Sequence, residues 1–345
     1  MTIFDLVKSD EIVAYWESLD QDREPYMFSE MFPADKKLGL DLSYIKGSSG
    51  LPCVLKTSAF DVKAIPRERI GFDKLTAEMP FFKESLYIDE KLRQELNMVL
   101  QTGNQTYIDT VMNRIFADET QLLEAAAATR ERMRTMALTT GAVAMAANGQ
   151  SYSYDYQVPS SHKFTNTSFN NDDYDIVKYI NECLDTIEDD TGTRPTRGVV
   201  SRAQWNAMKN NSFIAKNVYV LTNGVGTIND NTLRDYLFDE TGVEFVVYAK
   251  RYKDENKATK KFIPDNLVVL FPSGNLGTTW FGTTPEESDL MSGSAANVSI
   301  TDTGVAVTTV KQTDPVNVET KVTMICLPSF EMADQVAIID TTPST

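Results

Sequence analysis

The sequence predicts a protein of the α+β class that is organised around one long helix. Residues 104–139 form an unbroken helical pattern, and residues 160–260 mix helical and strand patterns in a compact stretch. Residues 262–345 are mostly strand-like. Helices and strands that are segregated along the chain, rather than alternating in a regular βαβ repeat, favour the α+β class.

The bulk composition restricts the classes of protein to which the chain can belong. The chain has 345 residues, of which 42% are hydrophobic and 24% charged, so about two packed domains are feasible. Its net charge of −16 repels the phosphates of nucleic acids. No apolar run approaches the roughly eighteen residues of a membrane span, and the first residues lack a signal pattern. We therefore expect neither membrane insertion nor nucleic-acid binding through the bulk charge.

Cysteine and histidine are too scarce for most metal sites and disulfide frameworks. Cys53, Cys183 and Cys326 are far apart and odd in number, which predicts buried thiols in a reducing compartment. The single histidine, His162, stands in a Ser/Thr/Asn-rich stretch. A histidine-dependent triad or metal site would depend on that residue alone.

The N-terminal 45 residues predict a short helix over 10–19 and then an aromatic arm. The arm, residues 23–33, is bounded by prolines, has no clear period and needs an apolar surface for its large side chains. That surface belongs either to a neighbouring molecule or to the arm's own domain. The side chains concerned are Tyr26, Phe28, Met31 and Phe32.

Residues 46–88 predict a long hairpin with a charged tip. A strand pattern at 53–60 and a return run at 75–88 flank Arg67 and Arg69. A long hairpin with little polar/apolar alternation is marginally stable by itself. We expect it to lean on a partner, and an ordinary surface hairpin is the alternative.

The helix predicted over residues 104–139 contains no proline or glycine, and its apolar residues recur at steps of three and four. Thr106 and Asp109 have the spacing of a capping box, and Gly141 suits a left-handed stop. At about 1.5 Å per residue the helix is on the order of 50 Å long. It is either a rigid spine or a long helix that covers one sheet of a globular domain.

The charged side of this helix changes sign along its length, from Asp118, Glu119 and Glu124 to Arg130, Arg132 and Arg134. That order suits the helix dipole. We expect the apolar stripe to pack on a sheet and the charged side to face solvent or a neighbouring molecule.

The remaining chain predicts a tight hairpin turn at Asn148 and Gly149, a compact α+β unit and a set of paired strands. A basic tract at 250–261 predicts a solvated turn. The expected elements are a helix at 172–189 with Asn171 as cap and Gly192 as stop, a strand at 198–201, helices at 203–210 and 231–240, and strands at 243–249, 267–271, 304–310 and 316–326.

No catalytic constellation is recognisable. The glycine clusters at 223–226 and 274–277 match no nucleotide-binding loop. The acidic pairs Asp189-Asp190 and Glu286-Glu287 could bind a cation, but exposed pairs near turns are more often solvated charge. Packing anchors are expected at Trp16, Trp205 and Trp280. No cofactor or metal is expected.

Two motifs near the C-terminus resemble the lambda-type (protein E) family of tailed-phage major capsid proteins. They are Phe-Ile-Pro-Asp-Asn-Leu-Val-Val-Leu-Phe at 262–271 and Leu-Gly-Thr-Thr-Trp-Phe-Gly-Thr-Thr-Pro at 276–285. In that family a Phe-x-Pro-Asp-Asn run leads into a buried strand and then into a Gly-x-x-x-aromatic-Gly segment. The order of arm, proline-bearing hairpin and long helix fits as well, so the resemblance covers residues from about 20 to 340.

The resemblance implies the Hong Kong 97-type capsid fold, with segments at stated places in the chain. These are an N-terminal arm at 1–45, an extended loop at 46–88, a peripheral domain at 89–159 with the spine helix at 104–139, an axial domain at 160–260, and returning peripheral strands at 261–345.

The same resemblance implies a structural role in the virion, with assembly in the cytoplasm of a bacterial host. The expected partners are copies of the chain in pentamers and hexamers, a separate scaffolding protein, a portal and, as in several large shells of the family, a decoration protein. The shell encloses DNA without sequence-specific binding. The expected contacts between subunits are Tyr26, Phe28, Phe32, Arg67, Arg69, Phe81 and Phe82. The alternatives are an encapsulin-like nanocompartment shell around an enzyme cargo and a soluble enzyme that uses the acidic pairs.

We predict that deleting residues 57–76 leaves a folded subunit but blocks the growth of shells, because the hairpin is expected to overlap an adjacent subunit. Circular dichroism would report the fold and electron microscopy the assembly. Normal shells from the deletion variant would contradict the role assigned to the hairpin.

Overall fold

The computed structural model describes residues 7–20, 24–45, 74–88, 90–219, 228–290, 296–313 and 316–342. The chain divides into two compact units. The first comprises Met1–Leu42, Thr76–Arg134 and Thr278–Ser329, and the second comprises Ser43–Leu75, Thr135–Gly277 and Phe330–Thr345. Among the described helices, none combines the length and the apolar character needed to cross a membrane.

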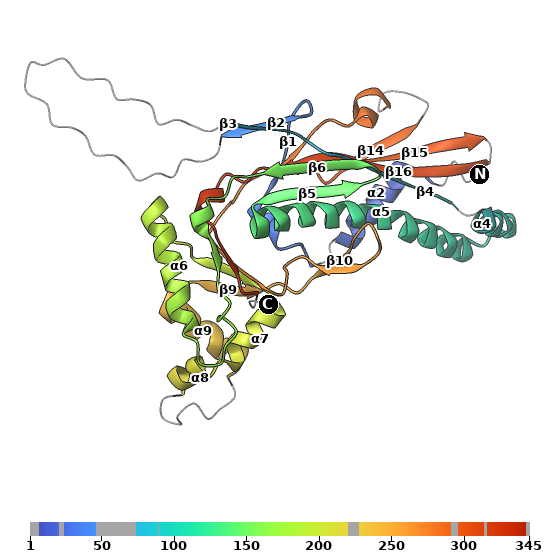
Figure 1. The fold of residues 1–345 in the computed structure, drawn as a ribbon. Coiled ribbons are helices and arrows are strands. Elements are labelled where there is room, and N and C mark those ends of the chain that lie inside the picture. Colours follow the sequence, from blue (N-terminus) through green and yellow to red (C-terminus); the bar gives the residue numbers. More distant parts are fainter. Residues whose placement is uncertain are drawn as a thin grey trace, which may run out of the picture. The chain divides into compact units, whose positions relative to one another are not determined.

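A six-stranded sheet forms the core of the first unit (Figure 1). Its order is β1-β13-β16-β15-β14, and β4 pairs with residues 319–325 of β16. Neighbours are antiparallel except for the parallel pair β1–β13. The predicted pairing of 304–310 with 316–326 is confirmed. The strands are β1 Ala34–Lys36, β4 Phe81–Tyr87, β13 Thr279–Phe281, β14 Asn297–Thr301, β15 Val305–Thr313 and β16 Val316–Pro328.

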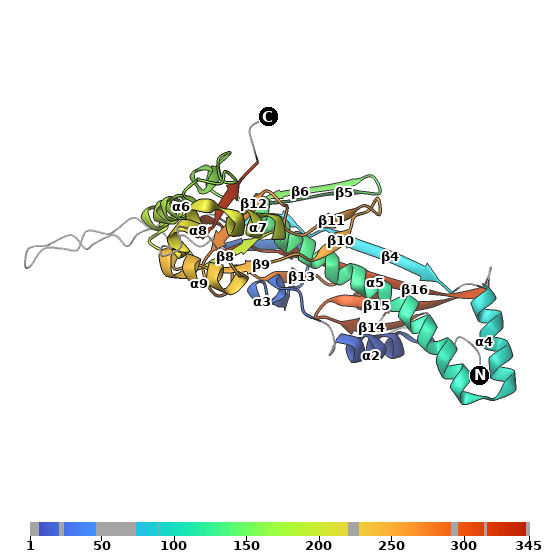
Figure 2. The same cartoon turned by 90° about the horizontal axis from the view of Figure 1, so that it is seen from below.

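The helices α2 (Ser9–Asp20) and α5 (Gln105–Thr140) cover one face of this sheet (Figure 2). Ser9 of α2 reaches β14, where its Oγ lies 2.9 Å from the Oγ of Ser299. The rings of Tyr15 on α2 and Phe116 on α5 lie 5.8 Å apart, so the two helices pack side by side. The apolar stripe of α5 is buried, as predicted. Its fully or nearly fully buried members are Val111, Met112, Ile115, Leu122, Leu123, Ala126 and Met133.

The predicted long helix is confirmed as one unbroken element, and only its N-terminal cap differs. The side-chain oxygen of Asn104 accepts from the N–H of Thr106 at 3.2 Å, so Asn104 rather than Thr106 is the cap. Asp109 instead accepts from the side chain of Gln105 at 2.8 Å. At the other end, Gly141 adopts φ 73° and donates to Ala137 at 3.0 Å, which is the predicted left-handed stop. Before α5 lies α4 (Glu90–Thr102).

The return run of the hairpin predicted at 46–88 is divided between two sheets. β2 (Asp41–Ile45) and β3 (Lys74–Glu78) form a two-stranded sheet. The second part of the return run is β4, which belongs to the six-stranded sheet and not to the hairpin. Because β3 and β4 are separated only by Met79 and Pro80, the sequence pattern did not reveal the change of partner. The strand predicted at 53–60 lies outside the described residues.

A five-stranded sheet in the order β7-β17-β12-β8-β9 forms the core of the second unit. Asp175, not Asn171, caps α6, since its carboxylate accepts from the N–H of Lys178 at 2.9 Å. Gly192 ends α6 at φ 75°, as predicted. The strands are β7 Lys163–Thr165, β8 Arg197–Val200, β9 Glu244–Val247, β12 Leu267–Phe271 and β17 Ala337–Asp340, and the helices are α6 Ile176–Thr191, α7 Arg202–Asn210, α8 Ser212–Val218 and α9 Asp230–Thr241.

The second unit differs from the sequence-based expectation in three features. The strands β12 and β17 pair with each other and join β8, so residues 267–271 and 337–340 belong to this unit rather than to the returning strands of the first. The helix α8 was not predicted. The basic tract forms a hairpin of β10 (Arg251–Lys253) and β11 (Thr259–Lys261) instead of a simple turn. A sequence pattern identifies a buried strand but not the sheet that contains it.

Smaller elements complete the chain. The hairpin β5 (Ala142–Ala147) and β6 (Gln150–Asp155) turns at Asn148 and Gly149, both with positive φ, as predicted. The short helical segments are α3 Phe28–Met31, η1 Ser160–His162, η3 Glu286–Leu290 and η4 Ala333–Gln335.

We predict that Gly198→Ala destabilises the second unit by about 1–3 kcal/mol, because it overpacks a filled core. A Cβ at Gly198 would lie 2.7 Å from the ring of Phe245, its partner on the adjacent strand. Thermal unfolding followed by calorimetry would show the loss. The double variant with Phe245→Leu is the control, since it makes room for the new methyl group. A wild-type melting temperature for Gly198→Ala would contradict this account.

Candidate functional site

Three charged side chains on neighbouring turns of α5 are buried in the first unit. Arg130, Glu131 and Arg134 are 8%, 0% and 6% exposed. The charged side of this helix was expected to face solvent or a neighbouring molecule, which is wrong for Arg130 and Arg134, whereas Asp118 and Glu124 are exposed. Each of the three buried side chains is buried because it has polar partners on other segments, which an amphipathic pattern cannot show.

Arg130 holds the turn between β14 and β15. Its Nη2 lies 2.6 Å from the carboxylate of Asp302, and its guanidinium lies over the ring of Phe281 at 5.8 Å. Asp302 and Thr303 adopt φ values of 47° and 72°, which non-glycine residues rarely do. The ion pair stabilises a turn that would otherwise be unfavourable.

Glu131 and Arg134 hold the N-terminal arm. The N–H of Phe28 donates to Glu131 at 3.3 Å, and Arg134 lies 3.6 Å from the other oxygen of Glu131. Arg134 also donates to the hydroxyl of Thr279 at 3.0 Å, and this hydroxyl donates to the carbonyl of Phe32 at 3.0 Å. Burial lowers the pKa of Arg134, and the charge of Glu131 acts against this shift. The arm, α5 and β13 thus share one buried polar network.

The arm residues predicted to contact neighbouring subunits lie mostly inside their own subunit. Phe28 and Phe32 have no exposed surface, and Met31 is 4% exposed. This corrects the prediction for Phe28 and Phe32, and the alternative left open by the sequence, packing on the arm's own domain, holds for them. Tyr26 is half-buried. The arm is held here because β1 pairs with β13.

The other predicted contact residues fall into two groups. Phe81 and Phe82 lie on β4, where Phe81 is 39% exposed and Phe82 is half-buried. Among the described strands β4 pairs with β16 alone, so its other edge is open. Arg67 and Arg69 lie outside the described residues.

Several exposed apolar side chains were not predicted. The exposure of Met98 could have been predicted, because Met98 does not share the helical face that Leu92, Leu96 and Val99 form in α4. Exposed apolar side chains of this kind mark surfaces for other proteins when they gather. The exposed apolar side chains, with their exposed fractions, are Leu38 (87%), Met98 (63%), Tyr107 (62%), Tyr87 (54%), Phe238 (53%), Leu40 (48%) and Leu86 (37%).

The acidic pair Glu286-Glu287 is not the solvated charge that the sequence predicted. Glu286 is 5% exposed, lies 3.3 Å from the ammonium of Lys83 and accepts from the hydroxyl of Thr323. Glu287 pairs with Lys36. No group of three or more metal-ligating side chains occurs among the described residues.

The pair Asp189-Asp190 is exposed, as the sequence predicted, and Asp190 also forms an ion pair. Asp190 lies 3.0 Å from Nε2 of His162, which is 1% exposed. This contact ties η1 to the end of α6. The single histidine of the chain therefore has a structural environment.

The thiols and tryptophans serve packing. Cys183 and Cys326 are buried and free, as predicted, and burial raises the pKa of each thiol to about 12, so neither is a reactive thiolate. Cys53 lies outside the described residues. Trp16 and Trp205 are 3% and 0% exposed. Trp280 is half-buried.

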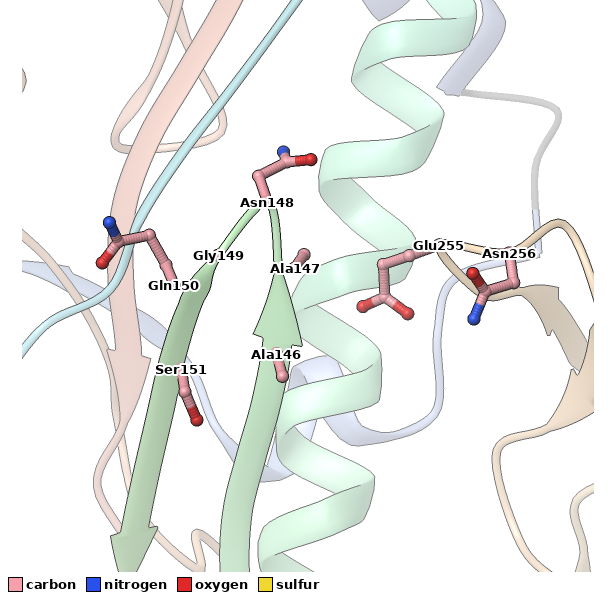
Figure 3. A pocket seen from close by; sticks show the side chains of 8 residues that line it. All are labelled: Ala146, Ala147, Asn148, Gly149, Gln150, Ser151, Glu255 and Asn256. Atoms are coloured by element: carbon pink, nitrogen blue, oxygen red, sulfur yellow. The ribbon is translucent and has the colours of Figure 1, made fainter.

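A pocket lies between two hairpin tips in the second unit (Figure 3). The turn of the β5–β6 hairpin lines one side, and Glu255 and Asn256 of the β10–β11 hairpin line the other. Ser151 is the one hydroxyl among the lining residues, which include no histidine, cysteine, lysine or arginine. The lining therefore offers one hydroxyl, on Ser151, and one carboxylate, on Glu255.

The exposed apolar side chains and the buried polar network of α5 are therefore the features that a proposed function has to explain. The sequence profile of the family described as phage major capsid protein E matches residues 8–340. The chain belongs to this family. A member of the family has a structural role in the viral capsid, and this agrees with the resemblance drawn from the motifs at 262–285. No curated protein matches the sequence.

Solved structures show the same fold over almost the whole chain. A capsid protein of a prophage of E. coli CFT073 is 14% identical, with a TM-score of 0.61 over 97% of this chain and 99% of that chain. A phage-related protein of Bordetella bronchiseptica RB50 is 12% identical, with a TM-score of 0.59 over 98% and 99%. The capsid of cyanophage A-1(L) gives 9% identity and a TM-score of 0.56 over 93% of each chain. The predicted Hong Kong 97-type fold is confirmed.

We predict that Glu131→Gln destabilises the capsid protein by about 3 kcal/mol, because it leaves the buried guanidinium of Arg134 without its counter-charge. Denaturant unfolding would measure the loss. The matched control is Glu182→Gln, which breaks the exposed pair with Lys178 at 3.9 Å and should cost less than about 0.5 kcal/mol. Equal effects of the two variants would contradict the role of the network.

Proposed function

We propose that this chain is the building block of the icosahedral head of a tailed bacteriophage, assembling as pentamers and hexamers around double-stranded DNA. The observation that carries the proposal is the match of residues 8–340 to the capsid protein E family. A match to a phage capsid family favours a virus head over the shell of an enzyme compartment.

The charge and the surface of the subunit support this role. A net charge of −16 keeps the protein from holding the packaged genome through its bulk field. The exposed apolar side chains on β4 and on the helices α4, α5 and α9 provide surface that copies of the chain can bury. We assign Tyr26, Arg67, Arg69, Phe81 and Phe82 to contacts between subunits.

Further partners follow from the proposed role. A separate scaffolding protein would guide the curvature of the growing shell, a portal would occupy one vertex, and a decoration protein would bind outside. Assembly would take place in the cytoplasm of the bacterial host.

We predict that the purified full chain, alone or with its scaffolding protein, forms capsomers, shells or tubes under the electron microscope. Phe81→Glu should abolish these assemblies while the melting temperature of the subunit falls by less than a few degrees, because the ring is 39% exposed and lies on an open strand edge.

Phe81→Leu is the matched control and should assemble, since it keeps an apolar side chain at the same place. A strictly monomeric wild-type chain at high concentration, with and without scaffold, would contradict the proposed function. Normal shells from Phe81→Glu would contradict only the assignment of Phe81.

A further inference from the structure

The middle of α5 carries a buried carboxyl group that has no counter-charge among the described residues. Glu119 is 3% exposed and lies on the same face of the helix as Ile115, Leu122 and Leu123, against the six-stranded sheet. Its Oε2 has no hydrogen-bond partner. On the opposing strand β16, the hydroxyl of Thr320 is fully buried and donates to the carboxyl of Glu119.

The other buried glutamates show what is missing at this position. Among the described residues, the buried glutamates are Glu119, Glu131 and Glu286. Glu131 lies beside Arg134, and Glu286 lies beside Lys83. No described residue forms an ion pair with Glu119. An ionised carboxylate buried without a counter-charge is strongly unfavourable, so the packing of Glu119 against the sheet favours the neutral carboxyl.

The neighbouring charges do not offer a substitute. On α5 itself the adjacent charge is Asp118, which is negative. Across the sheet, Thr309 of β15 and Leu86 of β4 stand opposite Thr320 and share its face. The next ionisable side chains on that face are Lys311, two residues after Thr309 on β15, and Glu84, two residues before Leu86 on β4. Both are exposed.

The titration of Glu119 agrees with this geometry. Burial raises the pKa of Glu119 to about 7. The hydrogen bond from Thr320 lowers this pKa in part, and the negative charge of Asp118 raises it. The ordinary value is 4.5. Since the pKa is higher in the packed state, the contact is at its most stable below pH 4.5 and loses stability as the pH rises towards 7.

We propose that Glu119 is a pH-sensitive contact between α5 and the sheet: the neutral carboxyl closes the middle of α5 on β16, and the ionised carboxylate opens the helix N-terminal to it. The opening stays in residues 105–123, because Arg130, Glu131 and Arg134 fix the later turns to three other segments. The proposal does not depend on shell assembly.

Amide hydrogen exchange of the full chain, corrected for the chemical effect of pH on exchange, tests the proposal. Between pH 6 and pH 8 the opening equilibrium of residues 105–123 should rise about tenfold, with its midpoint near pH 7. Residues 130–140 should change by less than about twofold. Glu119→Gln, which cannot ionise, should remove the change in 105–123. Glu124→Gln, an exposed position on the same helix, is the matched control and should keep it.

A pH response of 105–123 that persists in Glu119→Gln would overturn the proposal, as would an equal response in 130–140. The variant Thr320→Val is a second test, in which Glu119 itself is unchanged. It removes the hydroxyl that favours the ionised form, so the midpoint of the response should move to higher pH. An unchanged midpoint would also overturn the proposal.

Discussion

The structure of the first unit depends on the burial of three charges on α5. Arg130, Glu131 and Arg134 each bind a different segment: the β14–β15 turn, the arm and β13. Charges are expensive to bury, so the network is favourable only when all these segments are in place. It therefore specifies one arrangement of the arm and the sheet in a way that an apolar contact of the same area would not. The arm has little core of its own, and this network fixes it together with the pairing of β1 with β13.

The elements were largely predictable from the sequence, because their signals are local. The apolar spacing of α5, Gly141 at its end and the Asn148-Gly149 turn each specify a conformation within a few residues. Strand patterns likewise located β15 and β16 together with their pairing. The caps were displaced, since several polar residues near each helix start could serve, and the three-dimensional course of the chain selects Asn104 and Asp175.

What could not be predicted is non-local. The strands β4 and β12 were recognised, but their sheets were misassigned because a strand pattern contains no information on its partner. The burial of Phe28, Phe32 and the charges of α5 depends on pairing of the arm with β13, which is about 245 residues away along the chain. The capsid role came from the order of motifs along the chain and from the family match, and no single residue pattern would have established it.

The order of the strands has a consequence for synthesis on the ribosome. In the first unit, β4 and β1 receive their partners only when β13 and β16 have been made. In the second unit, β17 lies between β7 and β12, and both of these strands precede it in the chain. Neither sheet can close before these partners have been made, so both units complete their folding only after residues 316–340 have left the ribosome. Until then, the aromatic side chains of the arm stay exposed, and the nascent protein is a natural client for chaperones.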